Sequence, residues 1–240
     1  MNNTEIRKLL EAAVADSGFT RRGSAFFRVV GDGVLQLLKF EYERCFSHYN
    51  LAVGLFSMYG ELDRKWFTSG GCIPRYCVMN FVGGNGAILM QENGSHCTFE
   101  VVSPQEQIAV LTNHAMNALN NIGTQGQLVE AICQLDISSS GIIIWNDFEK
   151  FAPYLKVRNY ACAEKVIQSI IDQNTEGMEF KQKSMNLAEF SAHVARQSER
   201  LDHLYALLDM VKRKDDSEVD TYLCANQLEN NKHARFCIGQ

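Results

Sequence analysis

The sequence predicts an α+β fold with an N-terminal helix, an antiparallel sheet of about five strands, a packing helix and then a helical C-terminal extension. Three strand-like runs, at 18–30, 34–46 and 47–60, follow one another with only tight turns between them. Parallel strands need a crossover of a dozen or more residues, so these runs indicate an antiparallel meander and not a nucleotide-binding α/β fold. Beyond residue 141 the apolar residues recur at helical spacing, which predicts helices there.

The first helix is expected near the N-terminus, because apolar residues there recur at spacings of three and four. Asn2, with Glu5 three residues later, is a typical helix start, and Gly18 suits the stop. The apolar stripe comprises Ile6, Leu9, Leu10, Ala13 and Val14.

A β-hairpin is expected at Asp32-Gly33, a dipeptide that favours the tight turn between antiparallel strands. On the strand that follows, apolar and charged residues alternate, which predicts one face toward the core and one toward solvent. The apolar set is Leu38, Phe40 and Tyr42, and the charged set is Lys39, Glu41 and Glu43. The next strand, from Leu51 to Phe56, is apolar on both faces, so we expect it to lie centrally in the sheet.

A second hairpin is expected to turn at Asn93-Gly94. The segment 103–106 then offers a serine N-cap, a proline at the first helical position and a glutamate at the third. This pattern predicts a helix that packs on the sheet within a first domain at residues 1–136.

A helical domain is expected over residues 142–240, after a linker at 138–141. Its longest helix has a heptad-like apolar stripe, formed by Leu187, Phe190, Val194, Leu201, Leu204, Leu208 and Val211. Because short loops favour antiparallel neighbours, we expect this stripe to pack against helices 147–173 of the same chain. A monomer is therefore favoured, with a dimer through the heptad helix as the alternative.

Composition and charge favour a cytoplasmic protein whose partner is another protein. The net charge of −5 is not concentrated in either half, so neither half has the basic excess that general nucleic-acid binding needs. No apolar run approaches the ~20 residues of a membrane span, and no signal-peptide pattern is present, so no membrane partner is expected. The eight cysteines lack framework spacing and are expected to be reduced thiols.

The N-terminal part resembles a bacterial family that is known only as a domain of unknown function. The resemblance covers about residues 1–136 and implies the helix-then-meander fold, and it implies no reaction. It rests on residues of the first strands, namely Phe19, Arg21, Gly23, Phe26, Phe27, Arg28 and Gln36.

Motifs for catalysis or cofactor binding are not assembled in the sequence, so no catalytic residue, metal site or cofactor is assigned. There is no G-x-S-x-G elbow, and the six histidines are dispersed. Cys72 and Cys77 are zinc-ligand types, but their spacing is at the edge of the usual range. His96 and Cys97 would lie on opposite faces of a strand. The glycine cluster at 83–86 precedes a strand and not a helix, which favours a turn over a phosphate loop.

The candidate binding residues are Arg28, Lys39, Glu41 and Glu43, which we expect to form a polar platform on neighbouring strands. The leading hypothesis is a non-catalytic cytoplasmic binding or interaction protein. An antidote-like protein that masks a partner is one option within this class.

The alternative function is a hydrolase or a metal-dependent enzyme that uses a Glu/His cluster on the sheet. Carboxylates two residues apart on a strand perturb each other's pKa when they are buried, as acid–base catalysis requires. The residues of this alternative are Glu41, Glu43, His48 and His96.

Overall fold

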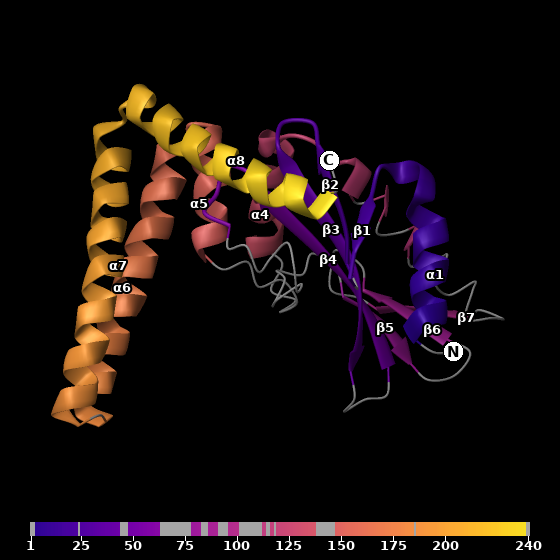
Figure 1. Ribbon diagram of the computed structural model, residues 1–240, viewed down its shortest axis with the longest axis horizontal. Helices are drawn as coiled ribbons and strands as arrows, with labels where there is room; N and C mark the ends of the chain where they lie inside the picture. Colours follow the sequence, from indigo (N-terminus) through magenta and orange to yellow (C-terminus); the bar gives the residue numbers. More distant parts are fainter. Residues whose placement is uncertain are drawn as a thin grey trace.

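The computed structural model describes residues 3–23, 25–43, 48–62, 78–82, 86–90, 96–100, 112–113, 116–117, 119–137, 147–184 and 186–238. Figure 1 shows an antiparallel sheet on one side of the molecule and a long helical hairpin on the other, with a last helix, α8 (Asp216–Ile238), that returns from the hairpin to the sheet. The predicted α+β class is confirmed.

The sheet is a seven-stranded antiparallel meander in which each strand pairs with its neighbours in sequence. The strands are β1 (Thr20–Arg22), β2 (Ala25–Val30), β3 (Val34–Glu43), β4 (His48–Ser57), β5 (Val78–Val82), β6 (Gly86–Met90) and β7 (His96–Glu100). The predicted number of about five strands was therefore too low. Gly23, at φ 60°, separates β1 from β2 within one predicted run, and β5 lies where glycine and proline breaks hid the strand pattern.

The predicted turn of the first hairpin is confirmed, because β2 and β3 pair up to Val30↔Val34 and leave residues 31–33 as the turn. Gly31 has a φ of 46°, a region that residues with a side chain rarely adopt. A Cβ added to Gly31 would lie 2.0 Å from the carbonyl oxygen of Gly123. The turn therefore approaches a distant backbone segment at a distance that only glycine allows.

Helices flank the sheet. Helix α1 (Asn3–Val14) continues into a short 3-10 turn, η1 (Ala15–Ser17), and Gly18 closes it at φ 73°, as expected for the predicted stop. Further helices are α4 (Gln125–Ile137), α5 (Asp147–Lys156), α6 (Tyr160–Ser184) and α7 (Leu187–Arg213).

One hydrophobic core joins the first face of the sheet to the helices. Phe26, Val34 and Leu38 of the sheet cluster with Leu10 of α1 and with buried residues of α4, α5, α6 and α7. The predicted linker at 138–141 lies outside the described residues, and the segments on both sides of it contribute to this single core.

A second cluster covers the other face of the sheet near the β2–β3 turn. Leu35 and Leu37 of β3 are each 1% exposed and cluster with Phe56 of β4 and Ala234 of α8. Helix α8 passes over this end of the sheet (Figure 1). The expected solvent-facing side of β3 is therefore wrong for this half of the strand, because a helix almost 200 residues away in sequence covers it.

Helix α7 packs along α6 of the same chain, as the heptad stripe predicts. The two helices form a hairpin that projects from the sheet (Figure 1), and the 25 residues of α6 span about 38 Å. Phe190 and Val194, on the half of α7 near the tip, are only half-buried. The fully buried side chains gather at the base of the hairpin: Ala163, Ile167, Ile170, Ile171, Leu204, Leu207, Leu208 and Val211.

Several predicted features lie outside the described residues: the turn at 93–94, the N-cap at 103–106, the first part of the glycine cluster, and both Cys72 and Cys77. Within the described part of the chain, Cys133, Cys162 and Cys224 are free thiols.

Candidate functional site

Strand register places most of the predicted binding residues on one face of the sheet. Alternate residues of a strand lie on opposite faces, so Lys39, Glu41 and Glu43 occupy the same face of β3 as Leu35 and Leu37. Because a strand rises about 3.3 Å per residue, Glu43 lies about 26 Å beyond Leu35. The charged half of β3 is therefore the half farther from the β2–β3 turn. Helix α8 passes over the other half, next to this turn (Figure 1).

Pairing extends this face across the neighbouring strands, because directly paired residues share a face. Glu43 is paired with His48, and Glu41 is paired with Asn50. The row of Glu41 continues through Asn50 to Asn80 of β5, Ile88 of β6 and Thr98 of β7. The polar positions of this face, called the polar sheet face below, are Arg22, Lys39, Glu41, Glu43, His48, Asn50, Asn80, His96, Thr98 and Glu100.

Beyond Gln36 and Ser57, which lie near the β2–β3 turn, the opposite face of β3 to β7 has only apolar and aromatic residues. It continues from Leu38, which is fully buried in the core. An antiparallel sheet with this contrast typically buries its apolar face and presents its polar face. The positions on the apolar face are Phe40, Tyr42, Tyr49, Leu51, Val53, Met79, Phe81, Ala87, Leu89, Cys97 and Phe99.

The register separates Arg28 from the other three predicted binding residues. Arg28 is paired with Gln36, which lies on the face opposite to Lys39, Glu41 and Glu43. The expected platform of four residues is therefore corrected: Arg28 does not belong to the polar sheet face. The error arose because the length of the turn, and not strand composition, fixes which residues of β2 and β3 share a face.

The guanidinium group of Arg28 ties three segments together on the core side of the sheet. It donates hydrogen bonds of 2.7 Å from Nε to Gln36 Oε1, from Nη1 to the Ser17 carbonyl oxygen and from Nη2 to Asn120 Oδ1. The guanidinium carbon also lies 4.5 Å from the centre of the Phe19 ring. Ser17 and Asn120 each end a helical stretch, and the carbonyl ends of helices attract cations. Burial lowers the pKa of Arg28, which stays charged at neutral pH. These contacts give Arg28 a structural role.

Gln36 lies at the centre of this junction and is fully buried. Its Nε2 donates to the carbonyl oxygens of Leu119 at 2.7 Å and Ile122 at 2.8 Å, while its Oε1 accepts from Arg28. The sequence analysis did not assign Gln36 this role of joining the sheet to the segment 119–122. The signal for it was that Gln36 is the one polar residue in the apolar run 34–38.

A second polar junction joins α7 and α8 to the segment that follows β4. Glu61 Oε1 accepts hydrogen bonds from Tyr222 OH at 2.9 Å and from His203 Nε2 at 2.8 Å. Asn230 Nδ2 donates to the carbonyl oxygen of Met58 at 2.8 Å. The pKa of the Tyr222 phenol is raised far above its ordinary value, mainly because the side chain is buried and secondarily because the Glu61 carboxylate is nearby. His203 therefore helps to hold α7 on the body of the protein.

The residues of the enzyme alternative share the polar sheet face, but they do not gather at one place on it. Glu43 lies directly opposite His48, and Glu41 lies two positions along β3. His96 is on β7, four strand spacings from β3, or about 19 Å across the sheet. The register therefore assembles a Glu–Glu–His group and leaves His96 outside it.

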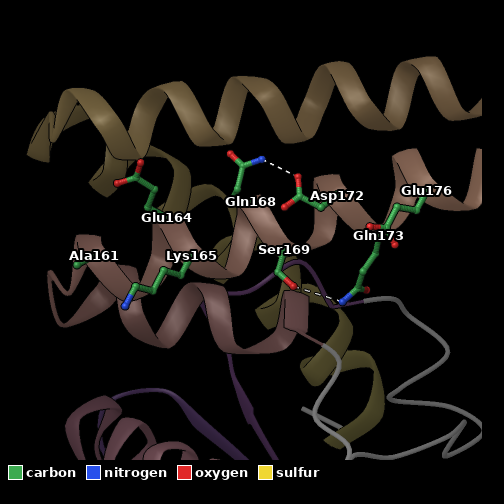
Figure 2. A pocket seen from close by; sticks show the side chains of 8 residues that line it. All are labelled: Ala161, Glu164, Lys165, Gln168, Ser169, Asp172, Gln173 and Glu176. Atoms are coloured by element: carbon green, nitrogen blue, oxygen red, sulfur yellow. Dashed lines mark hydrogen bonds between the residues drawn. The ribbon is translucent and has the colours of Figure 1, made fainter.

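A shallow groove of about 710 Å³ follows an exposed side of α6 (Figure 2). Its polar side chains bond to neighbours one helical turn away, with Gln168 Nε2 donating to Asp172 at 2.9 Å and Gln173 Nε2 donating to Ser169 at 3.3 Å. Such pairs stabilise an exposed helix face, and we assign no function to the groove. The residues that line it are Ala161, Glu164, Lys165, Gln168, Ser169, Asp172, Gln173 and Glu176.

Comparisons with known proteins give no relative: no protein-family model, no curated protein and no solved structure matches the chain. The resemblance to a bacterial domain of unknown function stays a prediction. None of the helices within the described ranges combines the length and the apolar character needed to cross a bilayer. Among the side chains that the structure describes, no group of three His, Cys, Asp or Glu residues is placed to hold a metal ion.

Proposed function

We propose that this chain is a non-catalytic interaction protein of the cytoplasm that binds a protein partner through the polar sheet face. The observation that carries the proposal is the change along one face of β3. The face is apolar at Leu35 and Leu37, where α8 covers it, and charged from Lys39 to Glu43. This face has charged or polar positions on β3, β4, β5 and β7, and its apolar positions are Ala52, Val78, Val82, Ile88 and Met90. With an apolar and aromatic face behind it from Leu38 onward, such a mixed face is suited to meet water and a protein partner.

The pattern of charge on this face favours a protein over a nucleic acid. Arg22 and Lys39 lie in one row, on either side of Ala25, and Glu41 and Glu43 lie in the next two rows. Nucleic acid presents phosphates of a single sign, whereas a protein surface can match both signs. Masking of a partner's functional surface, an antidote-like role, is one form of this proposal.

The test is retention of a partner by variants of the tagged protein in its native cell. Asn80→Arg places a large cation in the middle of the polar sheet face, and Gln168→Arg is the matched control on the exposed side of α6. We expect quantitative mass spectrometry to find a partner that the wild type and Gln168→Arg retain and Asn80→Arg loses. A partner set that is equal for all three folded proteins would contradict the proposal.

The second candidate function is the hydrolase or metal-dependent enzyme, which the pairing of Glu43 with His48 favours. A positioned acid or base typically contributes about 10²–10⁴-fold to a rate. Turnover of p-nitrophenyl ester or phosphate substrates that falls about 100-fold or more in Glu43→Gln, and not in Glu100→Gln, would support the enzyme. Equal rates in both variants would remove this support.

A further inference from the structure

Helices α7 and α8 are consecutive in the chain, and only Lys214 and Asp215, called the hinge below, separate them. At the hinge the chain turns away from the axis of α7 and carries α8 across to the sheet (Figure 1). Lys214 has a φ of 54°, a left-handed conformation that is strained for a residue with a β-carbon. Within the described part of the chain, its exposed side chain makes no hydrogen bond or ion pair. The bend at Lys214 is therefore held against backbone strain without a compensating side-chain contact.

The sequence around the hinge permits an unbroken helix. Residues 187–238 include neither glycine nor proline, the two residues that disfavour a helix most. The bend also depends on Asp215, whose Oδ1 accepts hydrogen bonds from the backbone N–H of Ser217 at 2.9 Å and of Glu218 at 3.2 Å. In an unbroken helix these two N–H groups bond to the carbonyl oxygens of residues 213 and 214 instead. With both hinge residues in helical conformation, α7 and α8 would form one helix about 78 Å long.

A single helix of this kind would carry α8 away from the sheet of its own chain. Helix α8 contributes the buried Val219 and Leu223 to the first core, and it covers Leu35 and Leu37 in the second cluster. An uncovered sheet face and a free α8 are both unfavourable in water, because both expose apolar side chains. A straight hinge is therefore compatible with the fold only when another helix takes the place of α8.

Polar contacts make this place specific for α8. Asn230 is 2% exposed, and its Nδ2 donates to the carbonyl oxygens of Met58 at 2.8 Å and Gly60 at 2.6 Å. Arg158 Nη2 donates to Asp220 at 2.6 Å. The α8 of a second copy supplies the same side chains in the same order, whereas an unrelated helix leaves these buried and charged groups unpaired. The occupant that fits the place is therefore the α8 of another copy.

We propose that two copies of this chain exchange α8 by straightening the hinge. In the exchanged dimer each α8 docks on the body of the other copy with the contacts that it has in the monomer, so the two states differ mainly at the hinge. The dimer releases the strain of two hinges and loses the freedom of one independent molecule, so its fraction rises with protein concentration. The α6–α7 seam stays within each chain. The inference is separate from the proposed function, because α8 lies over the half of β3 with Leu35 and Leu37 and not over the charged half.

The test is the oligomeric state of the purified full chain, measured by light scattering after size-exclusion chromatography. Samples at micromolar to millimolar concentration are first incubated warm, below the unfolding midpoint, so that α8 detaches and exchanges. We expect a monomer at the lowest concentration and a dimer fraction that rises with concentration. No larger species is expected, because a reciprocal exchange closes the assembly.

Substitutions at the hinge should shift this equilibrium in opposite directions. Lys214→Gly removes the β-carbon and with it about a tenfold factor of strain per hinge, so the dissociation constant of the dimer should rise about 100-fold for two hinges. Lys214→Ala is the matched control, because it removes the same charge but keeps the β-carbon, and it should dimerise as the wild type does. Asp215→Ala removes a cap that only the bent hinge needs, so the dissociation constant should fall by about tenfold or more.

Cross-linking of mixed isotopes distinguishes exchange from any other dimer. Lys232 follows Asn230 on α8, and Lys156 Nζ lies 4.1 Å from the centre of the Tyr59 ring, so both lysines are near the segment that Asn230 contacts. A lysine-reactive cross-linker is applied to dimers formed from ¹⁵N-labelled and unlabelled chains incubated together. Links between Lys232 and Lys156 should join labelled to unlabelled peptides in the dimer, and should stay within one chain in the monomer fraction.

Three results would overturn the proposal. The first is a chain that remains monomeric at millimolar concentration in both the wild type and Asp215→Ala. The second is a dimer in which the links between Lys232 and Lys156 stay within one chain. The third is a dissociation constant that Lys214→Gly leaves equal to that of Lys214→Ala. Circular dichroism checks that each variant is folded, and should Asp215→Ala fail to fold, the wild type and the two Lys214 variants decide.

Discussion

Replacement of Gln36 by methionine tests whether the buried junction behind the sheet stabilises the fold. Gln36 is fully buried and takes part in three hydrogen bonds, to the carbonyl oxygens of Leu119 and Ile122 and from Arg28. Methionine is similar in length and flexible, so the substitution removes these bonds with little change in packing volume. The change in unfolding free energy therefore reports the hydrogen bonds.

The expected loss follows from the groups that the substitution leaves behind. The Ile122 carbonyl and the Arg28 Nε–H lose the partner shown in the structure, whereas the Leu119 carbonyl keeps the backbone bond from Ile122 N at 3.0 Å. A buried group left without a partner costs about 1–3 kcal/mol, so we expect Gln36→Met to lower the unfolding free energy by about 2–5 kcal/mol. Such a loss is a large part of the 5–15 kcal/mol that is typical of a folded domain.

Urea unfolding followed by circular dichroism measures this loss. The control is Gln168→Met on the exposed face of α6, where the side chain bonds only to a neighbour on its own helix, and we expect a change within about 0.5 kcal/mol. A loss below about 1 kcal/mol for Gln36→Met would refute the reasoning, because it would mean that water replaces the amide without penalty.

Three further outcomes are expected. Gly31→Ala should lower the unfolding midpoint strongly, whereas Gly18→Ala, which has a similar φ but open space around it, should cost only about 1–3 kcal/mol of backbone strain in the same urea assay. Leu204 is 2% exposed, so Leu204→Ala should lower the unfolding free energy by about 2–5 kcal/mol, whereas Tyr205→Ala, at a side chain that is 51% exposed, should change it very little. Light scattering tests whether the seam is intramolecular. A wild-type dimer that Leu204→Asp converts into a folded monomer would contradict an intramolecular seam. Folding raises the pKa of Tyr222, so the stability that the neutral phenol contributes is complete below about pH 10 and is lost as the pH rises toward the raised pKa. The unfolding free energy above about pH 10 should therefore fall more in the wild type than in Tyr222→Phe. Unfolding curves at several alkaline pH values measure this difference.

Local signals predicted the local parts of the fold. The turn at 31–33 and the stop at Gly18 depend on the backbone freedom of single glycines, which is visible in the sequence. The stripe on α7 predicted its packing on α6, because apolar residues at heptad spacing need a neighbouring helix. The cover of Leu35 and Leu37 could not be predicted in this way, because α8 is distant in sequence and its contact residue there, Ala234, has no distinctive pattern.

In the candidate site, too, local sequence predicted some features and the pairing of separate strands set the others. Alternation along β3 was enough to group Lys39, Glu41 and Glu43 on one face. The positions opposite them, His48 and Asn50, follow only from the register of two strands, which depends on the length of the loop between them. Long-range pairing sets every further row of the polar sheet face in the same manner.

The return of α8 to the sheet also has a consequence for the order in which the chain is made. Asn230 bonds to the carbonyl oxygen of Met58, a separation of 172 residues. At about 5–20 residues per second, a ribosome needs roughly 10–35 s to add them. During that interval the face of the sheet with Leu37 and Phe56 is synthesised but lacks its cover. The nascent sheet must therefore be kept from other apolar surfaces until its last helix leaves the ribosome.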